Sequence, residues 1–160
     1  MANGIPIQPK DTRSYFMLPQ APEEAGYYIY GTPAEGAYQY AHPSMMTILF
    51  WVEREWSATE SRKFGIGNIS LANGEKRTEE HRSHIDGLQV DVRPLRKDGL
   101  HLPVTWKQTE YDGEATAKLI AIFFTHPFVK QVLFNDARIP GVRHWDRHDD
   151  HFHVATKPGG

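Results

Sequence analysis

The sequence contains no cysteine, which excludes disulfide bonds. This absence does not identify a compartment, because a chain without cysteine tolerates oxidising and reducing surroundings alike. A strong charge of either sign is missing as well, since the formal net charge is −2 at pH 7. Nothing therefore argues for a nucleic-acid partner, which would select a protein with a basic face.

Long apolar runs are also absent. No stretch is long enough to span a bilayer, and no apolar segment follows Met1 in the manner of a secretion signal. A length of 160 residues with 39% apolar composition predicts one domain, residues 1–160, with a modest core. Within it we expect a proline-rich extended arm over residues 1–26 and the core over residues 27–156.

The hydrophobic pattern predicts two main helices. One is expected over residues 43–59, with Pro43 in its first turn, and the other over residues 112–125, ended by Pro127. Alternating or short apolar runs predict strands over residues 64–71, 88–92, 128–135 and 151–154. We therefore expect an α+β fold: a small antiparallel sheet flanked by helices.

Two short stretches hold most of the nine histidines. Residues 81–91 read HRSHIDGLQVD, and residues 148–153 read HDDHFH. Imidazole and carboxylate groups in a compact set suit zinc better than calcium or magnesium. We therefore expect the two stretches to meet and to hold one metal ion.

Strand alternation predicts how the two stretches meet. The apolar side chains of residues 88–92 face the core, which places Asp91 on the opposite, wetter face. Gly87 permits a sharp bend that would fold His84 toward Asp91. On the C-terminal strand, His153 faces away from the core, so the zinc site is expected on the open face of the sheet.

Three protein ligands are then available: His84, Asp91 and His153. A catalytic zinc ion takes three protein ligands and keeps a fourth position for water, whose pKa it lowers from 15.7 to about 7. This ligand count therefore predicts a catalytic rather than a structural zinc site.

The remaining histidines of the two stretches are candidates for proton transfer. His151 shares a strand face with the ligand His153, so it is placed to exchange a proton with the water or to stabilise an oxyanion. His148 and His81 are candidates for supporting or proton-shuttling roles. Asp150 is an alternative base, although alternation places it on the other strand face.

Substrate recognition is predicted less specifically. Arginines could clamp substrate carboxylates through paired hydrogen bonds, or could form ordinary surface ion pairs. The candidates near the two stretches are Arg82, Arg93, Arg143 and Arg147. The tyrosine-rich segment 27–40 would either pack against the core or form a wall of the substrate groove.

The two stretches together resemble a known group of zinc peptidases. Ser83-His84-x6-Asp91, followed by His151-x-His153, is similar to the group that contains lysostaphin, D-Ala-D-Ala peptidases and the hedgehog N-terminal domain. The wider pattern, with residues 40–43 and 65–69, resembles the penicillin-insensitive murein endopeptidase family over residues 38–156. Glu80 departs from that pattern, in which a glycine usually precedes the first histidine.

The resemblance implies a zinc endopeptidase that cuts D-alanyl to meso-diaminopimelyl cross-links between peptidoglycan stem peptides. It implies that such a protein acts in the bacterial periplasm or cell wall. By motif position it also implies the roles of six residues: His84, Asp91 and His153 as metal ligands, and His151, His148 and His81 as active-site histidines.

Other functions and routes stay open at this point. The same group contains carboxypeptidases that trim terminal D-alanine, and members that bind a metal without turnover, which would make this chain a murein-binding module. Without a recognisable signal peptide, the chain could be a mature periplasmic enzyme, a phage lysis protein or a secreted antibacterial effector. An effector would have an immunity protein as its partner.

Overall fold

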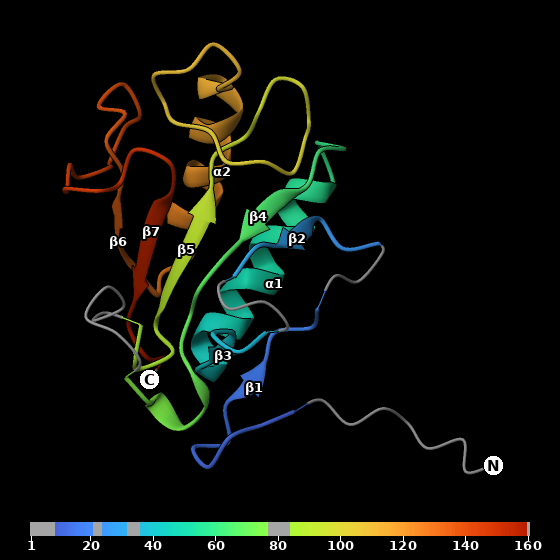
Figure 1. Cartoon of the computed structure of the whole chain (residues 1–160), viewed down its shortest axis with the longest axis vertical. Coiled ribbons are helices and arrows are strands. Elements are labelled where there is room, and N and C mark those ends of the chain that lie inside the picture. Colours follow the sequence, from blue (N-terminus) through green and yellow to red (C-terminus); the bar gives the residue numbers. More distant parts are fainter. Residues whose placement is uncertain (1–8, 21–23, 32–35, 77–83, 160) are drawn as a thin grey trace.

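The computed structural model describes residues 9–20, 24–31, 36–76 and 84–159. Figure 1 shows two helices and a set of short strands, which confirms the α+β class. The elements follow one another as β1 (Phe16–Met17), β2 (Tyr27–Ile29), β3 (Tyr40–Ala41), α1 (Pro43–Ser57), β4 (Phe64–Ile66), the short 3₁₀ helix η1 (Ala72–Gly74), β5 (Gln89–Arg93), α2 (Gly113–Phe124), β6 (Val129–Leu133) and β7 (Phe152–Thr156).

The main sheet has five strands in the order β2-β4-β5-β7-β6. Three of its pairs are antiparallel, but β2 and β4 run parallel, so the prediction of an antiparallel sheet is wrong for this pair. The physical reason is the connection through α1, because a helical crossover returns the chain in its original direction. A second sheet, in which β1 pairs with β3, was not predicted.

Both predicted helices are confirmed, and local capping explains where they begin. The Nδ1 atom of His42 accepts a hydrogen bond from the backbone N–H of Ser44 at 3.0 Å, and Pro43 occupies the first turn of α1. The carboxylate of Asp112 caps α2 by accepting from the N–H of Ala115 at 3.0 Å. These caps satisfy N–H groups that the helices themselves cannot pair.

The two helices cover one face of the main sheet, and the hydrophobic core lies between the helices and the sheet (Figure 1). Val90 and Val92 of β5 and Phe152 and Val154 of β7 are fully buried in this core. Burying such a side chain stabilises the fold by about 1.5–3 kcal/mol. Because side chains alternate along a strand, residue 91 of β5 and residue 153 of β7 face the side of the sheet away from the helices.

The predicted strand over residues 64–71 is only partly formed. β4 ends at Ile66, and the chain then turns toward the tyrosine-rich segment, where the N–H of Tyr40 donates to the carbonyl of Ser70 at 3.0 Å. The buried amide of Gln39 donates to the carbonyl of Gly67 at 3.1 Å. Backbone contact with β5 continues past β4, because the N–H of Gly67 donates to the carbonyl of Asp91 at 2.8 Å and the N–H of Asp91 donates to the carbonyl of Asn68 at 3.1 Å.

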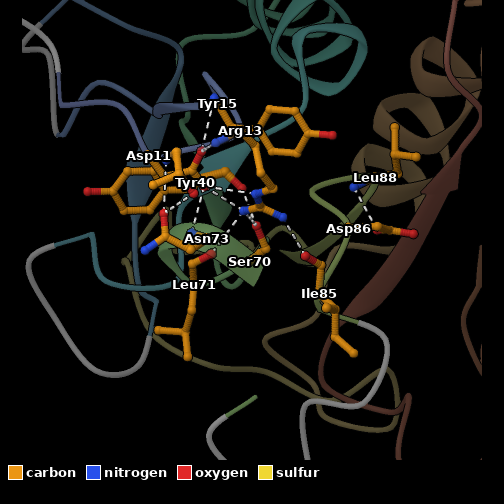
Figure 2. Close-up of polar contacts among 11 residues, drawn as sticks. Asp11, Arg13, Tyr15, Tyr40, Ser70, Leu71, Asn73, Ile85, Asp86 and Leu88 are labelled. Carbon is orange, nitrogen blue, oxygen red and sulfur yellow. Dashed lines mark hydrogen bonds and ion pairs between the residues drawn. The ribbon is translucent and has the colours of Figure 1, made fainter. Parts of the chain in front are cut away.

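The described part of the N-terminal arm is tied to the segment that carries His84. Figure 2 shows the guanidinium of Arg13 between two stretches of backbone. Its Nη1 donates to the carbonyl of Ile85 at 2.6 Å, and its Nη2 donates to the carbonyl of Leu71 at 3.0 Å. The carboxylate of Asp11 accepts from the Nε of Arg13 at 2.9 Å. Arg13 thus fixes the segment after His84 against residues 70–73.

Replacing Arg13 with alanine is expected to lower the free energy of unfolding by about 2–3 kcal/mol. The substitution leaves two backbone carbonyls and the buried Asp11 carboxylate without their charged donor, and hydrogen bonds to charged groups contribute about 1.5–3 kcal/mol. Urea unfolding followed by circular dichroism measures the change. The exposed Arg54 of α1 supplies the matched control, since Arg54→Ala is expected to change stability by no more than about 0.5 kcal/mol. Equal losses in both variants would contradict the bracing role of Arg13.

Candidate metal centre

His84 enters the site from the turn before β5, not from a strand. Gly87 makes this turn possible: its φ is +72°, and a Cβ there would lie 2.6 Å from the backbone nitrogen of His42, so the predicted bend at Gly87 is confirmed. The His84 ring is buried, and its Nδ1 donates to the carbonyl of Ile69 at 3.0 Å. Nε2 is therefore turned toward Asp91, 3.1 Å from Oδ2.

His153 reaches the same carboxylate from the neighbouring strand. It stands directly opposite Asp91 in the register between β5 and β7. Its Nε2 lies 2.7 Å from Oε1 of Gln89, and its Nδ1 lies 3.1 Å from Oδ1 of Asp91. Without metal, a proton on Nδ1 is donated to Asp91, whereas with a metal ion at Nδ1 the ring proton would lie on Nε2 and be donated to Gln89.

These three side chains form a group that could hold a metal ion. One ligand atom from each of His84, Asp91 and His153 lies within 4.8 Å of the others. Bonds of 2.0–2.2 Å in a tetrahedral zinc site place neighbouring ligand atoms about 3.3 Å apart. The distances here are similar: 3.1 Å from Nε2 of His84 to Oδ2 of Asp91, and 3.1 Å from Nδ1 of His153 to Oδ1 of Asp91. Imidazole and carboxylate lone pairs that point at one another need a cation or a proton between them. The donor set therefore fits a divalent ion of the zinc type.

In the absence of metal, the electrostatics favour a proton in the same place. Burial would raise the pKa of Asp91, but the charge of His84 and the hydrogen bonds from His153 and His84 hold it far below its usual value. Burial would likewise lower the pKa of His84, yet the charge and hydrogen bond of Asp91 outweigh it and raise that pKa. A proton and a metal ion thus compete for the same nitrogen of His84.

His151 lies beside the three-residue group without belonging to it. Its Nδ1 lies 2.8 Å from the carboxylate of Asp150, and its Nε2 lies 3.8 Å from Oδ1 of Asp91. Burial would lower the pKa of His151, but the hydrogen bond to Asp150 and the charge of Asp91 raise it. The side chain is thus oriented by one carboxylate and faces another, an arrangement suited to donating or accepting a proton at Nε2.

His148 completes a histidine cluster on this face. Its ring centroid lies 4.8 Å from that of His151 and 5.8 Å from that of His153, and its Nδ1 donates to the carbonyl of Asp146 at 2.8 Å. Burial lowers the pKa of His148. The structure thus brings five of the six predicted site residues together. The sixth, His81, lies outside the described residues, as does Arg82.

One polar side chain at the site, Gln89, was not predicted, and a second, Asp150, was predicted as an alternative base but on the wrong face. Gln89 orients His153, and its position two residues before Asp91 on the same strand face was a signal that could have identified it. Asp150 was expected on the far face of a strand, but β7 begins only at Phe152, so alternation does not apply to it. Its carboxylate instead holds His151 and lines the pocket beside the site.

A pocket of about 300 Å³ adjoins the candidate ligands, and it includes one of the tyrosines. Its lining comprises Tyr30, Asn68, Asp91, Arg93, Pro103, Asp150 and His151. Both interpretations of the tyrosine-rich segment therefore hold in part, because Tyr27 and Tyr38 are buried in the fold while Tyr30 forms a wall of this pocket. A larger hollow of about 870 Å³ lies around the first turn of α2 and contains none of the candidate ligands.

Comparisons with known proteins show a distant relationship to one group of peptidases. No family model matches the chain. The penicillin-insensitive murein endopeptidases of Escherichia coli O1:K1 / APEC and Escherichia coli strain SMS-3-5 are each 26% identical to it over 147 residues, which covers 74% of this chain and 54% of the relative. The chain thus spans about half the length of the curated relatives it matches. The family resemblance predicted from the motifs is confirmed as a distant one.

Within the described residues, neither α1 nor α2 has the length and apolar character that crossing a bilayer requires.

Proposed function

Because this chain is a distant homologue of the penicillin-insensitive murein endopeptidases, we propose that it is a zinc-dependent peptidase that hydrolyses D-alanyl to meso-diaminopimelyl cross-links in peptidoglycan. One observation carries the proposal: two imidazoles and a carboxylate, distant in sequence, converge at ligand distances with a further histidine facing them. A substrate in peptidoglycan would place its action in the bacterial periplasm or cell wall.

In this proposal His84, Asp91 and His153 hold the zinc ion. When bound, zinc supplies a Lewis acid for the scissile carbonyl and lowers the pKa of a water to about 7. Gln89 fixes the tautomer and the ring orientation of His153, and the carbonyl of Ile69 does the same for His84. Such partners of metal ligands commonly change metal affinity 10–100-fold when they are removed.

His151 is the proposed catalytic histidine. Since its Nδ1 is engaged by Asp150, only its Nε2 is available to hold or move a proton on the side of the metal ligands. Asp150 orients the ring and stabilises its charged form, as a carboxylate beside a catalytic histidine does. His148, whose ring contacts those of His151 and His153, is proposed to support them. His81 keeps the active-site role that the motif implies.

Digestion of purified peptidoglycan dimers tests the proposal. The zinc-loaded protein is expected to convert cross-linked muropeptide dimers to monomers, measured by chromatography and mass spectrometry. Loss of terminal D-alanine from intact dimers would show a carboxypeptidase instead. Binding of peptidoglycan without any product would favour a non-catalytic module. If dimers persist at several pH values while zinc remains bound, the proposed activity is wrong.

A further inference from the structure

Arg93 places a positive charge next to the candidate metal ligands. It follows Asp91 by two residues on β5, so both side chains leave the same face of the strand, about 7 Å apart along it. Both also line the 300 Å³ pocket, together with His151. The guanidinium therefore shares a cavity with the proposed catalytic histidine.

The fold orients this guanidinium but does not neutralise it. Its carbon lies 4.0 Å from the centroid of the Tyr30 ring, and its Nη1 lies 3.5 Å from the carbonyl of His101. Among the residues that the structure describes, no carboxylate lies within ion-pair distance of Arg93. Asp150, the acid that shares the pocket, makes its close contact with His151, and the charge of Arg93 adds only a smaller part to the lowering of the pKa of Asp150. A positioned arginine without an ion-pair partner is suited to binding a planar anion from outside.

The Tyr30 ring that lies under Arg93 packs on a neighbouring segment that contains two glycines. Tyr28 pairs with Gly65 in the parallel register, and a Cβ on Gly65 would lie 2.8 Å from the Tyr28 ring. A Cβ on Gly67 would likewise lie 2.7 Å from the ring of Tyr30. The tyrosine rings can therefore lie over this segment only because it has no side chains at these positions. This packing brings Tyr30 against Arg93.

The hydroxyl of Tyr30 is a second unused donor in the same wall. Its oxygen is buried, and it has no hydrogen-bond partner among the described residues. Burial raises the pKa of Tyr30 well above its ordinary value, so the group remains an O–H. A buried polar atom without a partner destabilises the fold, and such atoms are uncommon in folded proteins. The Tyr30 ring lines the pocket while the hydroxyl lies against Gly67, so a ligand would reach this donor only if the ring moved.

We propose that Arg93 and Tyr30 bind the free α-carboxylate of the substrate residue whose amine is released when the scissile bond is cut; this inference rests on the proposed function. In a cross-link between D-alanine and meso-diaminopimelate, that carboxylate is attached to the carbon that bears the scissile nitrogen. It therefore lies only about 3–4 Å from the scissile carbonyl carbon. A carbonyl held at the metal centre would bring the carboxylate into the adjoining pocket.

The charges of the pocket are consistent with an anionic ligand once the metal is present. Asp91 and Asp150 contribute two negative charges, while Arg93 contributes one positive charge. With His151 neutral these charges sum to −1, and a divalent ion bound by Asp91 would change the sum to +1. Carboxylate binding is therefore expected to depend on zinc as well as on Arg93.

Matched cross-linked peptides test the proposal in the zinc-loaded protein. One peptide carries the free carboxylate beside the scissile nitrogen, and the other carries a carboxamide there. The wild-type kcat/KM is expected to be about tenfold to a hundredfold higher for the carboxylate. Arg93→Gln should reduce this ratio to near one, whereas Arg143→Gln, at the exposed far edge of the sheet, should leave it unchanged. A ratio that survives in Arg93→Gln, or that is already near one in the wild type, overturns the proposal.

A binding measurement separates this proposal from the proposed activity. Calorimetry with the same peptide pair, the scissile amide replaced by a methylene-amine, reports carboxylate preference without turnover. Absence of cleavage of every peptide would count against the endopeptidase, while the calorimetric preference would still support or overturn the carboxylate pocket. Tyr30→Phe should weaken carboxylate binding about threefold to tenfold without loss of thermal stability, since the hydroxyl has no described partner. Unchanged affinity in Tyr30→Phe would remove Tyr30 from the site.

Discussion

Replacing Asp91 with asparagine is expected to weaken zinc binding by about two to three orders of magnitude while the fold is retained. Four-ligand structural zinc sites bind with about 10–16 kcal/mol, so one ligand contributes roughly 2.5–4 kcal/mol. Asp91 lies 3.1 Å from a nitrogen of both His84 and His153, and it supplies the negative charge of the group. Competition with a chromogenic chelator measures the affinity, and thermal unfolding of the metal-free protein checks the fold.

The control for Asp91→Asn is the same change at Asp86. Asp86 is exposed, and its carboxylate accepts from the backbone N–H of Leu88 at 2.9 Å (Figure 2). It lies in the turn between His84 and Asp91 and belongs to no candidate ligand set. Asp86→Asn should therefore bind zinc as the wild type does. Equal zinc affinity in the Asp91 variant and the wild type would exclude this ligand set.

Replacing His151 with alanine is expected to lower kcat for muropeptide dimers by about 10²–10⁴-fold, the usual contribution of a positioned acid or base. Zinc content should stay at the wild-type level, because the Nε2 atom of His151 lies 3.8 Å from Asp91 and outside the three-ligand group. Dimer cleavage and elemental analysis of the same preparation measure the two quantities together.

Exposed His144 provides the comparison for His151. It belongs to the same C-terminal region, so His144→Ala removes an equal side chain away from the ligands and should retain wild-type turnover. Loss of zinc from His151→Ala would instead make His151 a ligand. Retention of full activity would remove it from the catalytic machinery. The pattern that supports the proposal is loss of turnover with zinc retained.

The convergence at Asp91 could be predicted because it follows from local rules. Alternation on β5 places residue 91 opposite to Val90 and Val92, and a glycine at 87 allows the bend that turns His84 back. Both rules depend on neighbours in sequence. The same rule failed for Asp150. Alternation holds only within a strand, and the sequence did not show that β7 begins at Phe152, after Asp150.

The pocket beside the ligands could not be predicted in this way. It depends on Tyr28 standing opposite Gly65, a pairing between segments that are separated by α1. The three residues of β2 are too short to show a clear period, and aromatic side chains occur in core and groove alike. Parallel pairing added a second obstacle, because no hairpin turn marks it in the sequence. From the sequence, Arg93 could not be distinguished from the three other arginines that were candidates for binding the substrate. The register between β2 and β4 was needed to place it beside the pocket.

The position of β7 in the sheet has a consequence for the order of events during biosynthesis. β7 is the last strand of the chain, yet it lies between β5 and β6, which leave the ribosome before it. A nascent chain that lacks residues 152–156 has neither His153 nor the central strand of this half of the sheet. All three candidate ligands are therefore present only once the chain has been synthesised as far as residue 153. A proteolytic cut between β6 and β7 would separate His153 from the covalent chain that carries the other two candidate ligands.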